Sequence, residues 1–132
     1  ERYRRFGTFP ARFDDVLNFL PARLTPLAIA IAAGMLRLHP LNTWRCAWRD
    51  HAKHPSPNSA WGMAAFAGAL GIRLGGPTKY ATGWETYPYW GHVIEQLQIR
   101  HIRLARYLVM LTTLVFTLIM IVLALSLRRY VW

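Results

Sequence analysis

Two neighbouring carboxylates near the start of the chain, Asp14 and Asp15, are suited to metal-assisted chemistry. Asn18 follows three to four residues later, a step that places side chains on one face of a helix. Carboxylate and amide oxygens can together hold Mg²⁺ and the phosphate oxygens of a ligand, so this cluster is a candidate site. The alternative is structural: the two acids would mark the start of a helix and complement its dipole, while Arg12 and Arg23 lie at a membrane surface.

A second polar cluster lies in the middle of the chain, in a sequence rich in proline and serine. Asp50 or His54 could act as an acid–base group if a substrate lay against it. Ser56 and Asn58 precede a predicted helix, whose first backbone N–H groups can bind an anion. His51 and His54 could also be metal ligands, but no acid or thiol completes a known pattern. The alternative is a solvated polar turn.

A third cluster is the glycine-rich stretch from Gly68 to Pro77, which contains Arg73. Glycines allow a backbone to approach a phosphate closely, but this stretch is neither a Walker loop nor a GxGxxG motif that follows a strand. Tight packing is therefore the interpretation that the residues themselves favour. Cys46 is the only cysteine, which excludes an internal disulfide, and we interpret it as a packed small hydrophobe.

The element predicted most strongly is a transmembrane helix over residues 107–127. No charged residue interrupts this segment, and about 20 such residues are needed to cross a hydrocarbon core of about 30 Å. Arg128 and Arg129 follow it, and basic and aromatic residues are typical anchors at the headgroups. We expect one continuous helix over residues 93–129 that includes the span.

Together with this span, the rest of the sequence predicts an all-α integral membrane protein with a single domain. Residues 16–38 read as a second, shorter membrane-embedded helix, although Asn18, Pro21 and Arg23 interrupt it. Residues 39–92 read as a polar loop region with one short helix over 59–70. In that helix Ala60, Ala64 and Gly68 are spaced four apart, so they form a face of small residues that allows another helix to approach closely. If both apolar segments span, the positive-inside rule favours a cytoplasmic loop region.

The net charge of +10, from 16 Lys and Arg against six acids, raises the alternative of a nucleic-acid-binding protein. The charges cluster beside the apolar runs, as expected for an anionic membrane surface. Nucleic acid is therefore a disfavoured partner, and the lipid membrane is the favoured one.

The three clusters together resemble a known family. The segments ERYRRFGTFPARFDDVLNFLPARLT, WRDHAKHPSPNSAW and AGALGIRLGGPTKY, in that order, resemble the C-terminal part of adenosylcobinamide-phosphate synthase, the CobD/CbiB family. The resemblance extends to about Arg106. Beyond that point the chain is similar to the family only in being hydrophobic.

The resemblance implies a multi-pass protein of the bacterial inner membrane that acts in cobalamin biosynthesis. The implied reaction is an ATP-dependent amide ligation that joins adenosylcobyric acid, a corrinoid, to aminopropanol or its phosphate, with Mg²⁺ as a cofactor. Catalytic roles are expected for Asp14, Asp15, Asp50 and His54, with Asp14 and Asp15 also on the metal. Substrate-binding roles are expected for Arg12, Asn18, Arg23, Ser56, Asn58, Arg73, Gly75, Gly76 and Tyr80. Trp61, Trp84 or Trp90 could pack on the flat corrinoid.

A rival hypothesis is a truncated relative without catalysis of its own, which serves as an accessory subunit among other membrane proteins. Full-length family members are longer, and this chain begins at Glu1. We therefore expect it to lack an N-terminal portion of the family's fold.

Overall fold

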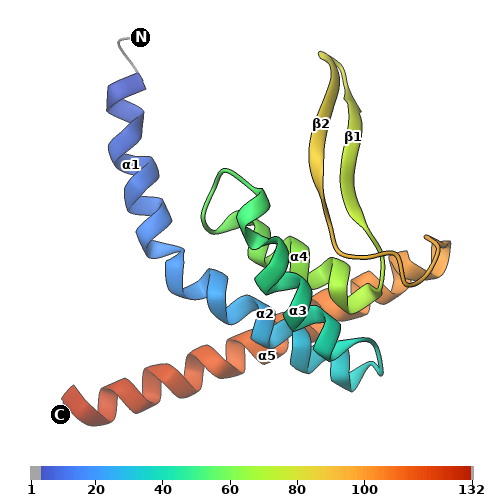
Figure 1. Cartoon of the computed structure of the whole chain (residues 1–132). Helices are drawn as coiled ribbons and strands as arrows, with labels where there is room; N and C mark the ends of the chain where they lie inside the picture. Colours follow the sequence, from blue (N-terminus) through green and yellow to red (C-terminus); the bar gives the residue numbers. More distant parts are fainter. Residues whose placement is uncertain (1–3, 132) are drawn as a thin grey trace.

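The computed structural model describes residues 4–131, and most of them are helical (Figure 1). In chain order the elements are α1 (Arg4–Leu17), α2 (Phe19–Met35), α3 (Pro40–Asp50), the 3₁₀ turn η1 (His51–Lys53), α4 (Ser59–Leu70), β1 (Leu74–Tyr80), β2 (Gly83–Trp90) and α5 (Ile99–Val131). Helices α2, α3, α4 and the N-terminal half of α5 pack together, and we call this group the helical body. Three arms leave it: α1, the β1–β2 hairpin and the C-terminal half of α5.

Small residues allow the helices of the body to approach closely. At Gly68 in α4, an added Cβ would lie 2.6 Å from the carbonyl oxygen of Asn42 and 2.9 Å from the Cα of Thr43, both in α3. The side-chain amide of Asn42 donates to the Gly68 carbonyl at 2.8 Å, which locks the two helices together. Cys46 is fully buried at this contact, as expected for a packed small hydrophobe. Of the predicted face of small residues, Gly68 thus packs against another helix, whereas Ala60 and Ala64 cluster with Trp90 of the hairpin.

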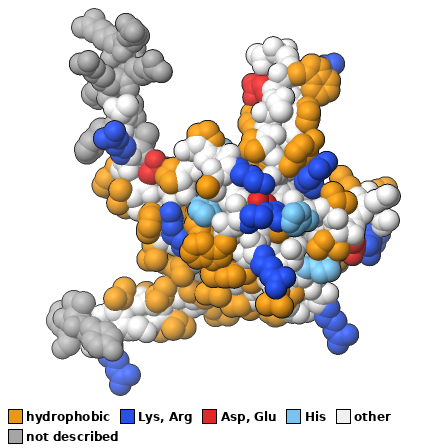
Figure 2. All heavy atoms as spheres, viewed as in Figure 1, with side chains coloured by type: hydrophobic (Ala, Val, Ile, Leu, Met, Phe, Trp, Pro, Cys, Tyr) orange, Lys and Arg blue, Asp and Glu red, His pale blue; other side chains and the backbone are white. Residues whose placement is uncertain are grey.

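Helix α5 contains the predicted span and is the only helix in residues 4–131 that is long and apolar enough to cross a membrane. Its N-terminal half packs on α2, where Leu108 joins Ile29 and Ala32 in the core. Its C-terminal half projects from the body with apolar side chains on its surface (Figure 2). Helices α2 and α4 are apolar but shorter. These features are those of a membrane protein.

The polar loop region contains a β-hairpin, so the expectation of an all-α fold is wrong for residues 74–90. The strands are antiparallel, with Leu74 opposite Trp90 and Tyr80 opposite Gly83. Tyrosine, tryptophan and threonine recur along this segment, and aromatic and β-branched residues suit a pleated strand. Its glycines and prolines concealed the strand signal, because such residues usually mark loops.

Two helix boundaries also differ from the predicted ones. Residues 16–38 do not form one helix: α1 ends at Leu17 and α2 begins at Phe19. Pro21 has no N–H to donate to the Leu17 carbonyl, which explains an interruption at Asn18. Asp14 and Asp15 therefore lie in the last turn of α1, and the interpretation that they mark a helix start is wrong.

The last helix begins at Ile99, later than the predicted residue 93. The preceding segment is tied to the end of α4 instead, because the backbone N–H groups of Ile94 and Glu95 both donate to the carbonyl of Gly71. Helix α3 was not predicted at all, although Pro40 at its first position is a favourable helix start.

Candidate functional site

The first and second polar clusters meet around one cavity of about 310 Å³, which we call the carboxylate cavity. It is lined by residues from the α1–α2 junction and from the loop before α4: Asp14, Asp15, Asn18, Pro21, Ala22, Thr25, Ser56, Asn58 and Ser59. The sequence separation across the cavity is about forty residues, so the fold brings together two motifs that the sequence only places in order. Thr25 and Ser59 were not among the predicted site residues.

Hydrogen bonds fix the polar side chains of this cavity. The Asn18 amide donates to Oδ1 of Asp14 at 2.9 Å, as the shared helix face predicted. The Asn58 amide donates to the backbone carbonyl of Asp15 at 2.8 Å and lies 3.4 Å from Oδ1 of the same residue. Arg23 donates to the side-chain oxygen of Asn58 at 2.7 Å. Asn58 is thus the link between the two motifs.

Asn58 stands at the N-cap position of α4, but its side chain makes no capping bond there. Its amide is used instead to join α4 to the α1–α2 junction. Arg23, its partner, is held in turn by the ring of Phe19, 3.5 Å from its guanidinium carbon, and by the carbonyl of Phe19 at 3.0 Å. This arrangement makes Arg23 a residue that orients Asn58, while Arg12 is exposed on α1.

The carboxylate oxygens of the cavity suit a magnesium ion whose other ligands come from a bound substrate and water. No group of three or more His, Cys, Asp or Glu residues gathers at one point within residues 4–131, so these residues form no all-protein metal cage. Mg²⁺ normally binds through one or two carboxylates together with phosphates and water. Asp14 and Asp15 supply that number of carboxylates on one cavity wall.

A second cavity, of about 280 Å³, lies between the hairpin and α4, and we call it the aromatic cavity. Its lining residues are His54, Met63, Gly75, Tyr80, Tyr87 and Trp90. His54, Gly75 and Tyr80 were predicted site residues; Met63, Tyr87 and Trp90 were not, except that Trp90 was considered as a stacking residue. Simple alternation does not reveal them, because Met63 lies in α4 and Tyr87 and Trp90 are three residues apart in β2.

Gly75 and Gly76 serve the packing of the hairpin. Both have positive φ, at the point where the register of β1 shifts. An added Cβ would lie 2.1 Å from the Pro88 carbonyl oxygen at Gly75 and 2.3 Å from the Tyr89 ring at Gly76. Only glycine fits such positions. Arg73 packs its guanidinium on the Tyr89 ring, 4.0 Å from its centre.

Asp50 is fully buried at the base of the hairpin, where basic and histidine side chains gather on the surface (Figure 2). It accepts hydrogen bonds from Arg49 at 2.7 Å and from the Gly91 backbone N–H at 2.8 Å, and it forms an ion pair with Lys53 at 2.8 Å. Burial by itself would raise the pKa of Asp50, but these bonds outweigh it and hold the pKa well below its usual value. So weak a base does not suit proton abstraction, and the geometry favours a structural role.

Two of the three tryptophans considered for packing on a ligand lie in the interior. Trp61 is stacked with His51 at 4.1 Å between ring centres and donates to the Pro57 carbonyl. Trp61 and Trp90 are 4% and 2% exposed, whereas Trp84 near the hairpin tip is 71% exposed. Of these three, only Trp84 offers a ring face to a large ligand.

The arrangement of these motifs can be compared with known proteins. A model of the CobD/Cbib protein family matches residues 1–109, which is most of the chain and includes all three polar clusters. This chain belongs to the CobD/CbiB family. The resemblance seen in its motifs is thereby confirmed, and with it a link to cobalamin biosynthesis.

Similar CobD/CbiB proteins come from several bacteria. The chain is 55% identical over 80 residues to the cobalamin biosynthesis protein CbiB of Salmonella typhimurium, which covers 61% of this chain and 25% of that protein. It is 46% identical over 99 residues to the cobalamin biosynthesis protein CobD of Klebsiella pneumoniae, covering 75% and 31%. The CobD of Dehalococcoides mccartyi is 48% identical over 87 residues, covering 66% and 28%. The match thus spans about a quarter to a third of each relative, and no solved structure matches the chain.

Proposed function

We propose that this chain forms part of the active site of an ATP-dependent amide ligase of cobalamin biosynthesis. The reaction would join a propionate carboxylate of adenosylcobyric acid to aminopropanol or its phosphate. The observation that carries the proposal is the carboxylate cavity, in which two family motifs meet on opposite walls. Membership of the CobD/CbiB family supports the pathway.

The roles follow from the chemistry of the lining. A carboxylate is a poor electrophile, so its activation by ATP requires phosphates to be held and their charge neutralised. Asp14 and Asp15 would hold a nucleotide-bound Mg²⁺, which supplies that neutralisation. Asn18 and Asn58 keep the two acids in place, and Ser56 would donate to a substrate oxygen.

The remaining predicted residues take supporting roles in this proposal. Arg12 is exposed on α1, two residues before Asp14, and would meet an anionic substrate group. Arg23 positions Asn58, Asp50 fixes the base of the hairpin, and Gly75 and Gly76 shape the bulge in β1, the strand that ends at Tyr80. His54 remains the acid–base candidate, since it lines the aromatic cavity with only part of its surface covered.

The setting we propose is the bacterial inner membrane, with α5 as one of several spans. The long apolar helix and the family support a membrane location. The segment between the two apolar helices, residues 37–106, would face the cytoplasm, because it holds nine of the 16 Lys and Arg and the rule for short loops places such residues inside.

A second candidate is a non-catalytic accessory subunit of a larger membrane complex. The observation that favours it is the apolar surface of α5, where side chains such as Val122 are exposed and would pack on other membrane proteins. In this case the carboxylate cavity would be a remnant that holds helices together.

The test uses membranes from a strain that lacks its own synthase. The chain would be expressed alone and together with the remainder of a CbiB relative, and formation of the amide from adenosylcobyric acid, aminopropanol and ATP would be followed by mass spectrometry. We expect product in at least the second case, and a loss of at least about 100-fold for Asp14→Asn and Asp15→Asn, since each removes a charge from the phosphate site.

Glu95→Gln is the matched control, because it neutralises a half-buried acid that pairs with Arg100 away from the cavity. It should leave the rate within about twofold. Full activity in both aspartate variants would overturn the ligase site, and absence of product in every combination would favour the accessory subunit.

A further inference from the structure

Apart from His54, the residues that line the aromatic cavity have no assigned role in the ligation described above, yet the lining has the character of a ligand site. Three aromatic rings, an imidazole and a thioether converge on it from three parts of the chain: His54 from the loop before α4, Met63 from α4, and the rest from the hairpin. Aromatic side chains bind planar rings by stacking, and a methionine sulfur adds favourable contacts with a ring.

We propose that the aromatic cavity binds a planar heterocycle of the size of a nucleobase. At about 280 Å³ it lies just below the range of about 300–1,000 Å³ typical of drug-sized ligands, which excludes a macrocycle and fits one small ring system. Proteins that bind nucleic-acid strands hold unpaired bases by stacking them on aromatic residues. The same interaction would hold the base of a nucleotide here.

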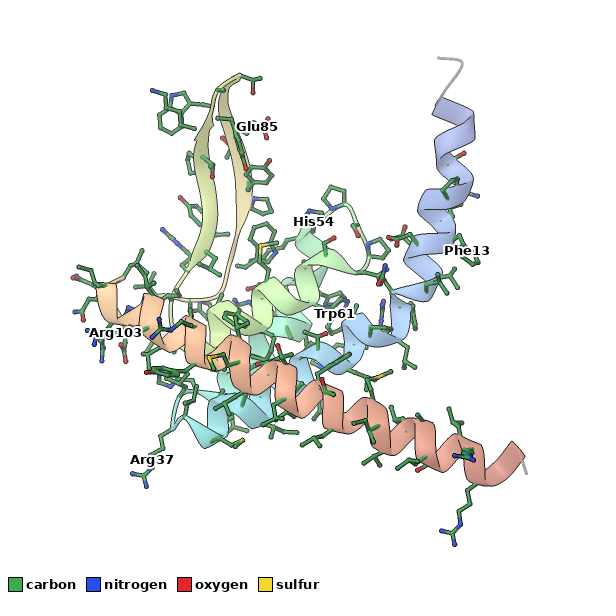
Figure 3. The ribbon with its side chains drawn as sticks, turned by 180° about the vertical axis from the view of Figure 1, so that it is seen from behind. Phe13, Arg37, His54, Trp61, Glu85 and Arg103 are labelled. Carbon is green, nitrogen blue, oxygen red and sulfur yellow. The ribbon has the colours of Figure 1, made fainter. Side chains whose placement is uncertain are left out.

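The loop before α4 contributes residues to both cavities, and this suggests which planar ligand enters. His54 lines the aromatic cavity, while Ser56 and Asn58, only a few residues later, line the carboxylate cavity. The Ser56 backbone N–H donates to Nδ1 of His54 at 3.0 Å, which keeps this turn compact. Figure 3 shows His54 on the loop between the hairpin and α1. A nucleoside triphosphate would place its base beside His54 and its phosphates toward Asp14 and Asp15; this second half rests on the proposed function.

Adenosine is the direct probe, because it carries the base without the phosphates. Binding would be measured by equilibrium dialysis with the full chain in detergent micelles. We expect saturable binding that Met63→Trp abolishes by filling the cavity and that Tyr80→Ala weakens by about 5-fold or more, the loss of one stacking ring. Trp84→Ala is the matched control: it removes an exposed ring from the same hairpin outside the cavity and should change binding less than twofold.

The outcomes separate this site from the ligation site. No adenosine binding to the unaltered chain, or equal binding by the Met63→Trp and Tyr80→Ala variants, would overturn the base site. Asp14→Asn and Asp15→Asn should weaken Mg-ATP at least 10-fold and leave adenosine unchanged. If those variants bind Mg-ATP normally while Tyr80→Ala does not, the base site stands and the proposed phosphate site fails.

Discussion

The helical body and the three arms solve the problem of apolar surface in opposite ways. In the body the buried residues are mostly alanine, as at Ala32, Ala47, Ala64 and Ala65, and the helices lie so close that Gly68 admits no side chain. In the arms large apolar residues are exposed, with Val122 at 61% on α5 as an example.

The difference shows where each part obtains its stability. Close packing between small residues is satisfied within the chain, although the outer face of α3 in the body also exposes large apolar residues such as Leu41 and Trp44. The exposed apolar face of α5 is stable only in surroundings that are themselves apolar, and a helix of this length matches lipid. The carboxylate cavity lies where the body meets the α1 arm, so its geometry depends on both kinds of contact.

The largest expected effect comes from filling the contact between α3 and α4. Gly68→Val should destabilise the protein by more than about 3 kcal/mol, because the new side chain meets backbone atoms of Asn42 and Thr43 that cannot move aside. The measurement is chemical unfolding in detergent, followed by far-ultraviolet circular dichroism.

Gly34→Ala provides the matched control within the same body. An added Cβ at Gly34 meets no atom within 4 Å, so the better helix propensity of alanine should raise stability by about 0.5–1 kcal/mol. Equal stability of the Gly68→Val and Gly34→Ala variants would mean that the body is not closely packed.

A smaller effect, confined to one arm, is expected at the middle of the α5 span. Leu118→Arg places a charge at a side chain that is 54% exposed. Helical content in detergent should hardly change, but the cost of insertion should rise by about 3 kcal/mol. Membrane fractionation of expressing cells would show less of the variant in the bilayer than of Leu97→Arg, which alters an exposed leucine outside α5. Equal membrane fractions for the two variants would contradict a span at this position.

The sequence established the order of the polar clusters but not their arrangement in space. The family resemblance placed Asp14 and Asp15 in one motif and Asn58 in the next, and the structure brings the two motifs to one cavity. The sequence did not reveal that Asn58 joins Asp15 to Arg23, because the two hydrogen bonds connect residues 43 and 35 positions apart. Nor did it reveal that Asp50 is enclosed by cations, since burial is a property of the packed chain.

The fold shows the same division. An uninterrupted apolar run and a row of small residues are local signals, and they predicted the helix that contains residues 107–127 and the close contact at Gly68. The hairpin was missed because glycine and proline usually signal a loop, whereas here Gly75 and Gly76 admit the bulge and the rings packed against it. This role of the two glycines depends on residues of the opposite strand, which a local sequence pattern does not include.

The smallest expected effect tests the joint between the body and the hairpin. Asp50→Asn removes the charge that Arg49 and Lys53 neutralise and weakens the bond to Gly91, so we expect a loss of about 2 kcal/mol at pH 7. This expected loss is smaller than the loss of about 3–5 kcal/mol that is typical of breaking a buried ion pair, because Arg49 and Lys53 are both 39% exposed. Hydrogen exchange should accelerate in the hairpin first, since Lys53 also donates to the Tyr89 carbonyl.

The pH dependence gives the sign of this contribution. Because folding lowers the pKa of Asp50, its stabilisation is complete above the ordinary carboxyl pKa of about 3.9 and is lost as the pH falls toward the folded value. The difference in unfolding free energy between the unaltered chain and Asp50→Asn should therefore be constant from pH 7 to about 5 and shrink below pH 4. If this difference in unfolding free energy stays constant down to pH 2.5, the contribution of Asp50 to stability does not depend on its charge.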